Sequence, residues 1–219
     1  TLNPVNDVVI PFKNLVNDAF CADTSIKTRS QLDAKRRAGS FVGNFCAYGY
    51  MKSPDNHNRL VPDPFAADVV RDIFKAIREG MTADAVGRML NDAGILSPME
   101  YKRSKGLRYA CNFKKHDRCL WSAQAVLRIA KNPVYTGTLV QGRVSTPNHK
   151  VKRRVQRAGD DLITVRGAHE ALISERDFAI VQRLLATDLR AAPGKQTVYP
   201  MSGLCRCADC GAPMVRKTS

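Results

Sequence analysis

Apolar residues in the first part of the chain recur at helical spacing and predict one long helix over residues 12–38. The stripe runs from Leu15 through Ala19 to Ile26, in steps of three or four positions that lie on one face of a helix. After Ile26 the stripe ends, and the last turns are polar on nearly every side and basic. A helix of this kind is either a solvated linker or a rod laid along a phosphate backbone.

Alternating apolar and polar residues follow, and then three amphipathic helices. Residues 45–63 alternate around the turn-forming stretch SPDNHN, which predicts a short hairpin. The helices are predicted over residues 63–80, 82–94 and 122–132, each begun by a side chain that can accept from the free amide groups of a first turn. These cap residues are Asp63, Thr82 and Ser122.

The pattern of apolar and polar residues changes again after residue 96. Residues 97–120 are polar and basic, and they predict a long loop that is functional or flexible. Strands are predicted over Val134 to Val144 and Leu162 to Val165, followed by a helix that begins at Ser174 and a linker over residues 188–200. The whole pattern predicts an α+β fold with a small antiparallel sheet.

Composition adds a strong positive charge to this picture. The 219 residues carry 35 Lys and Arg against 20 Asp and Glu, a formal net charge of +15. Nearly all of the excess falls in residues 101–157, which hold fifteen basic side chains against Asp117 alone, and a smaller basic run covers residues 27–37. Such a distribution is typical of a nucleic-acid contact surface, and the alternative is a solvated face that keeps the protein soluble.

The helices at 82–93 and 122–131 match an expanded helix-turn-helix, in which the second helix lies in the major groove of DNA. Its solvent face offers Gln124 and Arg128, which can grip adenine and guanine bidentately, while Lys131 suits a phosphate. The alternative is a pair of core helices that pack through Trp121.

Seven cysteines are present, and three of them lie close together as Cys205, Cys207 and Cys210. In a reducing compartment such a group indicates metal ligands, and Cys207 with Cys210 forms one knuckle of a zinc ribbon that needs a second pair of ligands. Because that pair is absent, we expect no zinc in this chain alone. The remaining candidates are weaker: Cys111, His116 and Cys119 are most simply incidental loop residues, and Cys21, Cys46 and His169 are expected in the core.

Several motifs occur in one order along the chain. They are YGY at residues 48–50, RLVPDPFAADVVRDIF from Arg59, LNDAGILSP from Leu90, WSAQAV from Trp121, NPVYTG from Asn132, HKVKRR from His149, HEALISERDFAIVQRLL from His169 and SGLCRCADCGAPM from Ser202. Over residues 12–215 this series resembles the recombinase domain of large serine recombinases, of the transposon and prophage integrase type.

The resemblance implies a division of the chain into four parts. Residues 1–39 would be the linker helix that leaves a catalytic domain, 40–188 the DNA-binding domain, 189–200 a linker and 201–219 the first knuckle of a truncated zinc ribbon. The catalytic domain, with the serine that attacks DNA, has no match here, so we expect no catalytic residue in this chain although the parent protein would be an enzyme. The parent would bind zinc through Cys207 and Cys210 together with a second cysteine pair.

The expected partner is double-stranded DNA, bound by a dimer at each site and by a tetramer in the synaptic complex of the parent protein. Residues 27–37 would run near the minor groove and the rest would grip flanking DNA. The candidate DNA-binding residues are Lys27, Arg29, Lys35, Arg36, Arg37, Lys102, Arg103, Gln124, Arg128, Lys131, Arg143, Lys150, Lys152, Arg153 and Arg154.

Two other classes of function remain open, a helix-turn-helix transcription regulator and an RNA-binding module with a zinc ribbon. No independent enzymatic motif such as a phosphate-binding glycine loop or H-E-x-x-H occurs. No stretch approaches the roughly 18 apolar residues of a membrane span, and no secretory signal is evident, so we expect a cytoplasmic, nucleoid-associated bacterial protein. The start at Thr1 and the end soon after Cys210 lead us to expect that both ends are cut.

Overall fold

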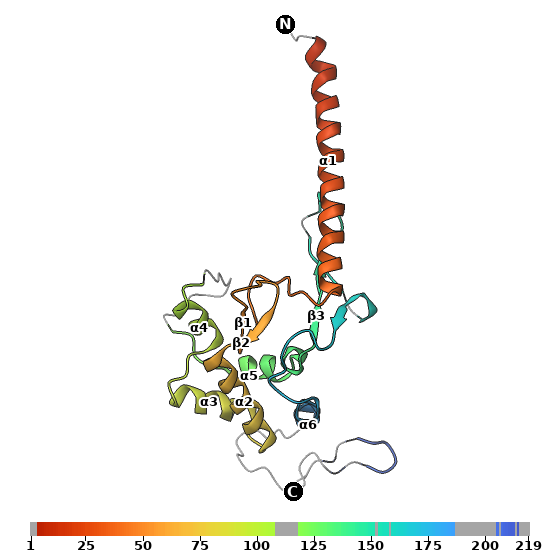
Figure 1. Cartoon of the computed structure of the whole chain (residues 1–219). Coiled ribbons are helices and arrows are strands. Elements are labelled where there is room, and N and C mark those ends of the chain that lie inside the picture. The colour runs from red at the N-terminus through yellow and green to blue at the C-terminus, as the bar shows by residue number, and fades with distance from the viewer. Residues whose placement is uncertain are drawn as a thin grey trace. The chain divides into compact units, whose positions relative to one another are not determined.

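The chain has an α+β fold, as its pattern predicts. A computed structural model describes residues 4–107, 118–151, 153–157, 159–186, 205, 207–212 and 214. The chain divides into two compact units, Thr1–Asp68 with Pro133–Leu172, and Val69–Asn132 with Ile173–Ser219. The helices and strands of both units are labelled in Figure 1.

The first unit begins with one long helix, α1 (Pro4–Arg37), the red and orange rod of Figure 1. It starts earlier than the predicted residue 12 because Pro11 is accommodated inside the helix rather than at its start. The helix ends at Arg37, and Gly39 follows with a φ of 78°, the left-handed conformation that a glycine adopts without strain. The amide of Ser40 then donates to the carbonyl of Lys35 at 3.0 Å, which closes the last turn.

The apolar stripe of α1 is not a packing face. Leu15 is 68% exposed and Ile26 is 61% exposed. Cys21 is also exposed, so the expectation of a core position for it is wrong. The error has a physical reason: helical spacing shows that apolar residues share a face, but it does not show whether another element covers that face.

The rest of the first unit is built from short antiparallel pairs. The predicted hairpin is present, with β1 (Tyr50–Lys52) paired to β2 (Leu60–Pro62) so that Met51 faces Val61. Further along, β3 (Leu139–Gln141) pairs with β6 (Ile163–Val165), and β4 (Val144–Ser145) pairs with β5 (Val155–Gln156). The 3-10 turns η1 (Pro133–Thr136) and η2 (Gly159–Asp161) precede β3 and β6.

The core of the first unit forms around tyrosine hydroxyls that bond to backbone carbonyls. The hydroxyl of Tyr135, which is 1% exposed, donates to the carbonyl of Tyr48 at 2.8 Å. The hydroxyl of Tyr50 donates to the carbonyl of Glu170 at 2.8 Å. His169 is buried as predicted, and its ring meets the Tyr50 ring edge to face with centroids 4.8 Å apart. These bonds satisfy polar groups that burial would otherwise leave without partners.

The second unit is helical, and its helices begin where the cap residues predict. The chain enters it along α2 (Pro64–Arg78), whose first turn is capped by the Asp63 carboxylate through the amide of Ala66 at 3.1 Å. Thr82 caps α3 (Ala83–Asp92) and Ser122 caps α5 (Ala123–Ala130). The Ser174 hydroxyl caps α6 (Glu175–Ala186) by accepting from the amide of Asp177 at 3.0 Å.

Two predictions about the connecting segments need correction. The expected loop at 97–120 contains a short helix, α4 (Pro98–Ser104), begun by a proline in its first turn. The expected strand from Val134 to Val144 is interrupted, because its first residues form η1 instead. Apolar residues such as Val134 are buried there, so the hydrophobic signal identifies the core but not the backbone conformation.

Candidate nucleic-acid interface

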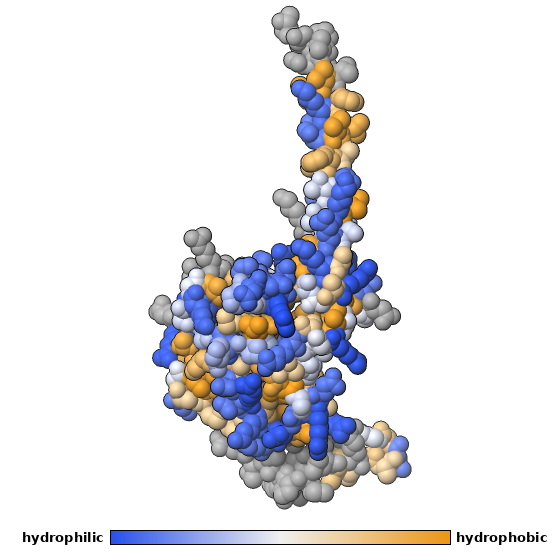
Figure 2. Space-filling view, viewed as in Figure 1, coloured by the Kyte–Doolittle hydropathy of each residue, from blue (hydrophilic) through white to orange (hydrophobic). Residues whose placement is uncertain are grey.

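Three of the five basic residues in the C-terminal half of α1 are exposed, while Arg29 and Arg36 are partly buried. Lys27 is well exposed and pairs with Asp23 one turn earlier, at 2.7 Å between Nζ and Oδ2. Lys35 and Arg37 are exposed in the last turn. Figure 2 shows apolar side chains on the N-terminal half of the helix and more hydrophilic ones toward its C-terminal half. Surface pairs such as Lys27 with Asp23 hold little energy, so this lysine can exchange its partner for a phosphate.

A segment more than a hundred residues away in sequence lies against this helix. Arg29 donates from Nη1 to the carbonyl oxygens of Thr146 at 3.2 Å and Pro147 at 2.8 Å. Closer to the N-terminus, Asp18 accepts from Lys150 at 2.8 Å and contacts His149 at 3.0 Å. The hydrogen bond from Lys150, followed by that from His149, lowers the pKa of the Asp18 carboxyl below its ordinary value of 3.8.

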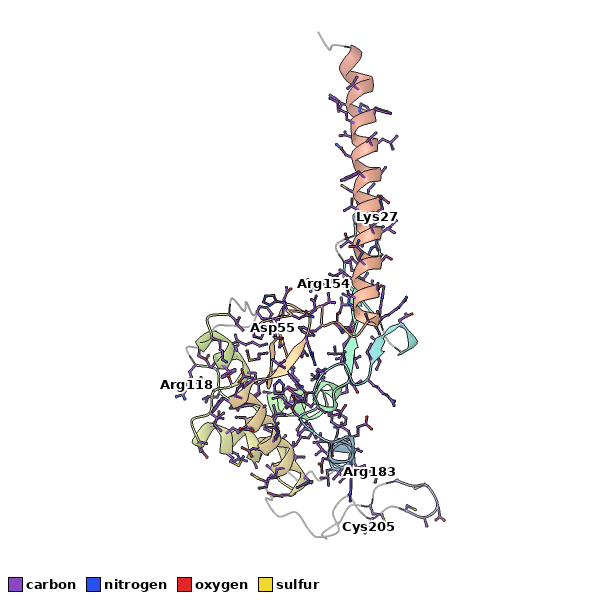
Figure 3. All side chains as sticks on the ribbon, in the orientation of Figure 1. Lys27, Asp55, Arg118, Arg154, Arg183 and Cys205 are labelled. Atoms are coloured by element: carbon purple, nitrogen blue, oxygen red, sulfur yellow. The ribbon has the colours of Figure 1, made fainter. Side chains whose placement is uncertain are left out.

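We call the surface formed by residues 27–37 of α1 and residues 143–157 the α1–hairpin surface. Figure 3 shows Lys27 on the helix and Arg154 beside the same helix nearer its C-terminal end. Arg143, Arg153 and Arg154 are all exposed. Lys152 lies outside the described residues. The structure thus brings together two of the basic runs that the sequence shows separately.

The base of α1 is fixed by one side-chain amide. Gln141 in β3 donates from Nε2 to the carbonyl of Ser40 at 2.8 Å and accepts at Oε1 from the amide of Val42 at 3.0 Å. The side chain therefore pairs with the exit segment of the helix much as a neighbouring strand would. These two hydrogen bonds of Gln141 connect the exit segment of α1 to the small β3–β6 sheet.

In the second unit, α3 and α5 form a tightly joined pair. The Asn91 side chain donates to the carbonyl of Trp121 at 3.0 Å and accepts from its amide at 2.8 Å. The indole of Trp121 donates to the carbonyl of Ile95 at 3.0 Å. The two helices approach closely at Gly87, where a Cβ would lie in ordinary van der Waals contact with the backbone of Ser122, at 3.6 Å. Trp121 is thus buried between the helices, and its backbone and indole are hydrogen-bonded to Asn91 and Ile95.

The candidate base-reading residues lie on the outer side of this pair. Gln124 and Arg128 are exposed on α5, while Val126 and Ile129 of the same helix are buried. Lys131 is exposed at the C-terminal cap. The amphipathic division of α5 therefore leaves the two side chains that can grip bases free to reach a ligand.

Arg103 of α4 makes an ion pair within its own helix, and its role as a DNA contact stays a prediction. Arg103 pairs with Glu100 at 2.6 Å, and Glu100 also accepts from the amide of Cys119 at 3.1 Å. The bond from the Cys119 amide, with the charge of Arg103, holds the pKa of the Glu100 carboxyl below 4.5. Glu100 therefore holds the segment around Cys119 on α4, and Arg103 pairs with the same carboxylate, an arrangement that the sequence does not indicate.

The cysteine group at the C-terminal end forms a tight turn. Cys207 accepts at its carbonyl from the amide of Gly211 at 3.0 Å, and its own amide donates to Ala212 at 2.9 Å. Amides of Cys210 and Asp209 also lower the pKa of the Cys207 thiol. A thiol with a lowered pKa on a turn with Cys210 suits one half of a tetrahedral zinc site. Within the described part of the chain, no three His, Cys, Asp or Glu side chains gather as a metal site.

The weaker cysteine and histidine grouping is described only in part. Cys111 and His116 lie outside the described residues, and Cys119 contacts the sulfur of Met99 at 3.6 Å.

None of the described helices is long and apolar enough to cross a membrane. The α1–hairpin surface belongs to the first unit and the outer side of α5 to the second, so their use by one DNA duplex stays a prediction.

Comparison with known families decides the identity of the chain. The family model described as Recombinase matches residues 64–188, which is more than half of the sequence. The chain belongs to the Recombinase family. The resemblance of its ordered motifs to the recombinase domain of large serine recombinases is thereby confirmed at the level of the family. The match covers α2 to α6, and it therefore includes the α3–α5 pair and residues 143–157 of the α1–hairpin surface.

Two curated relatives of this Recombinase chain are uncharacterized proteins. YefB of Bacillus subtilis (strain 168) is 32% identical over 121 residues, which are 55% of this chain and 37% of the relative. Protein y4bA/y4pH of Sinorhizobium fredii (strain NBRC 101917 / NGR234) is 32% identical over 180 residues, 76% of this chain and 24% of the relative. The chain thus spans well under half the length of both.

Two solved structures are similar in part. One is described as a crystal structure of an LSR–DNA complex, with a TM-score of 0.49 and 17% identity over 82% of this chain and 46% of that chain. The other comes from work on the sequence requirements of the Listeria innocua prophage attP site. It has a TM-score of 0.45 and 17% identity over 72% of this chain and 51% of that chain.

Proposed function

We propose that this chain is the DNA-binding region of a site-specific serine recombinase that integrates or excises a mobile element. In this proposal the chain recognises an attachment site and carries no catalytic residue. The nucleophilic serine belongs to a different domain of the parent protein. Membership of the Recombinase family supports the proposal from the side of sequence.

The observation that carries the proposal is the α1–hairpin surface. Its basic residues come from two segments separated by more than a hundred positions, yet the contacts of Arg29 with Thr146 and Pro147 hold them side by side. Bringing many like charges together costs energy unless a polyanion compensates for it. Duplex DNA, with a negative charge about every 1.7 Å along its axis, is a ligand that supplies this compensation.

The α3–α5 pair supports a second part of the proposal, the reading of bases. Gln124 and Arg128 are exposed on a short helix that Trp121 and Asn91 anchor firmly. A firmly anchored helix with bidentate side chains on its outer side has the properties of a recognition helix in the major groove. Lys131, at the end of α5, would contact a phosphate and set the register.

The proposal extends to zinc and to assembly in the parent protein. Cys207 and Cys210 would supply two thiolate ligands, and a second cysteine pair of the parent would complete a tetrahedral zinc site. Zinc there would stabilise the ribbon fold. One dimer would occupy each DNA site and two dimers would meet as a tetramer in the synaptic complex. We propose the transposon or prophage origin on the same grounds of resemblance.

Binding assays with two nucleic acids test the central claim. Fluorescence anisotropy with a random 30-base-pair DNA duplex and with a hairpin RNA of equal length should give tighter binding to DNA, and a falling affinity with rising salt. Tighter binding to the RNA would favour the RNA-binding alternative. Failure to bind either nucleic acid at low salt would reject the proposal.

The helix-turn-helix regulator remains the second candidate, because the α3–α5 pair suits an operator equally well. Sequencing the reading frame upstream of Thr1 separates the two. A serine-bearing resolvase-like domain is required for a recombinase and has no place in a simple regulator.

A further inference from the structure

A groove of about 380 Å³ runs along the α1–hairpin surface, within the first unit. Its walls are formed by the C-terminal half of α1 and by β4 with the residues around β5. Four arginines and one acid contribute to the lining, together with Leu32, Val144, Ser145 and Thr146. The charged residues are Arg29, Arg36, Arg154, Arg157 and Asp33.

Hydrogen bonds on both sides hold the groove in shape. On the side of α1, Arg29 donates from Nε to the carbonyl of Ser25 at 3.1 Å and from Nη1 to the hairpin carbonyls. At the base of the hairpin, the amide of Arg157 donates to the carbonyl of Arg143 at 2.8 Å. The Asp18 contacts with His149 and Lys150 add a third attachment further along the helix. The groove is therefore a built feature with fixed walls.

The charge of the groove is uncompensated. Asp33 is the one acid in the lining, and its carboxylate already pairs with Arg36 at 2.6 Å. Within the described part of the chain, no carboxylate pairs with the side chains of Arg29, Arg154 or Arg157. Three guanidinium groups thus share a concave space, where low-dielectric walls concentrate their positive potential.

We propose that this groove is a phosphate-binding site that takes one backbone phosphate of duplex DNA, held by Arg154 and Arg157 with Arg29 at its wall. The inference rests on the proposed function and specifies it. The planar guanidinium fork matches two phosphate oxygens at once, which favours phosphate over a monatomic anion. A phosphate held between α1 and the hairpin would fix both elements to one point of the DNA backbone, and so set register without reading sequence.

Arginine footprinting tests whether the groove binds phosphate and from which source. The whole chain is treated with phenylglyoxal in sodium chloride alone, in inorganic phosphate at the same ionic strength, and with a 30-base-pair duplex, and each modified arginine is quantified by mass spectrometry. Arg153 is the internal comparison, because it is exposed and adjacent to Arg154 but does not line the groove. We expect the duplex to slow modification of Arg154 and Arg157 more than that of Arg153.

The salt dependence of DNA binding supplies an independent measurement. Replacing both Arg154 and Arg157 by Gln should lower the slope of log affinity against log salt by about 0.9, the value for one phosphate on duplex DNA. If Arg154 and Arg157 instead contacted two separate phosphates, their replacement would lower this slope by about 1.8. The matched control replaces Arg59 and Arg166 by Gln, which removes the same charge from two exposed residues of the same unit outside the groove. We expect no change of slope for the control.

Each outcome decides between the alternatives. Equal protection of Arg153 and Arg154 by DNA, or a slope change as small as that of the control, would overturn the groove site while leaving DNA binding by the chain intact. Protection by inorganic phosphate but not by the duplex would make the groove a site for free phosphate and overturn its assignment to the backbone. Absence of any DNA binding by the unaltered chain would reject the proposed function itself.

Discussion

His169 shows how a single buried residue can make stability depend on pH. Its Nε2 lies 2.7 Å from the carbonyl of Val134, and because a carbonyl only accepts, Nε2 must carry the proton. The other ring nitrogen, Nδ1, is buried without a hydrogen-bond partner among the described residues. Burial lowers the pKa of His169 below its ordinary value of 6.5, more than the bond to Val134 raises it.

The first prediction concerns acid sensitivity. Above pH 6.5 the ring is neutral in both the folded and unfolded chain, so its contribution to stability is fully present. As the pH falls below 6.5 the unfolded chain takes up a proton more readily, and stability declines until the lowered folded pKa is passed. Urea unfolding at pH 8 and pH 5 should show this loss, and His169→Gln should reduce it. An equal loss in the variant would exclude His169 as its cause.

The second prediction at this scale concerns Arg128, whose exposed position on α5 suits contact with a base. Replacing Arg128 by Ala should reduce discrimination between the true site and random DNA by about 1 to 3 kcal/mol, the energy of one bidentate contact. Arg88→Ala is a suitable control, because Arg88 is exposed on α3 and pairs with Asp84. Competition binding with both DNAs measures the difference. Unchanged discrimination in the Arg128 variant would remove this residue from base reading.

At the scale of elements, the joint between α3 and α5 depends on Asn91. Its side chain makes two hydrogen bonds to the backbone of Trp121. Asn91→Ala should lower the free energy of unfolding by about 2 kcal/mol, from two bonds of about 1 kcal/mol each. Asp92→Ala, at the adjacent exposed position, should change it by less than about 0.5 kcal/mol. Urea denaturation measures both, and similar values for the two variants would contradict the proposed joint.

Helix starts are the elements that the sequence predicts best. The side-chain oxygens of Asp63, Thr82 and Ser122 accept from backbone amides three residues later, so the signal is local and the structure agrees with it. The exposed stripe of α1 and the 3-10 turn at Val134 could not be predicted in the same way. Both depend on which distant segment packs against them, and periodicity carries no information on that.

The same limit applies to the candidate interface. Lysine and arginine runs identify the α1–hairpin surface as two separate segments, but the sequence does not show that Arg29 joins them through hairpin carbonyls. Arg157 belongs to the basic segment 101–157, but the sequence does not single it out as a DNA-binding residue. Its place in the groove follows from strand pairing of β4 with β5, which is a contact between residues eleven or so positions apart.

At the scale of the whole molecule, the uneven distribution of charge should dominate the response to salt. If six or more phosphates are neutralised, affinity for duplex DNA should fall about a thousandfold between 50 and 200 mM salt. Anisotropy titrations at four salt concentrations measure the slope, and circular dichroism at each concentration controls for folding. A slope near zero would show that the excess of fifteen positive charges does not meet the DNA backbone.

The two hydrogen bonds of Gln141 have a mechanical consequence for the 34-residue helix whose base they hold. At 1.5 Å per residue α1 extends about 51 Å. Because the hairpin is bonded to Arg29 and Asp18, the helix and the hairpin would tilt together as a lever whose fulcrum is at Ser40 and Val42. A tilt of about 5° at that fulcrum would carry the far tip through about 4 Å. Small adjustments of one glutamine side chain are thereby magnified into displacements comparable with the spacing between neighbouring strands.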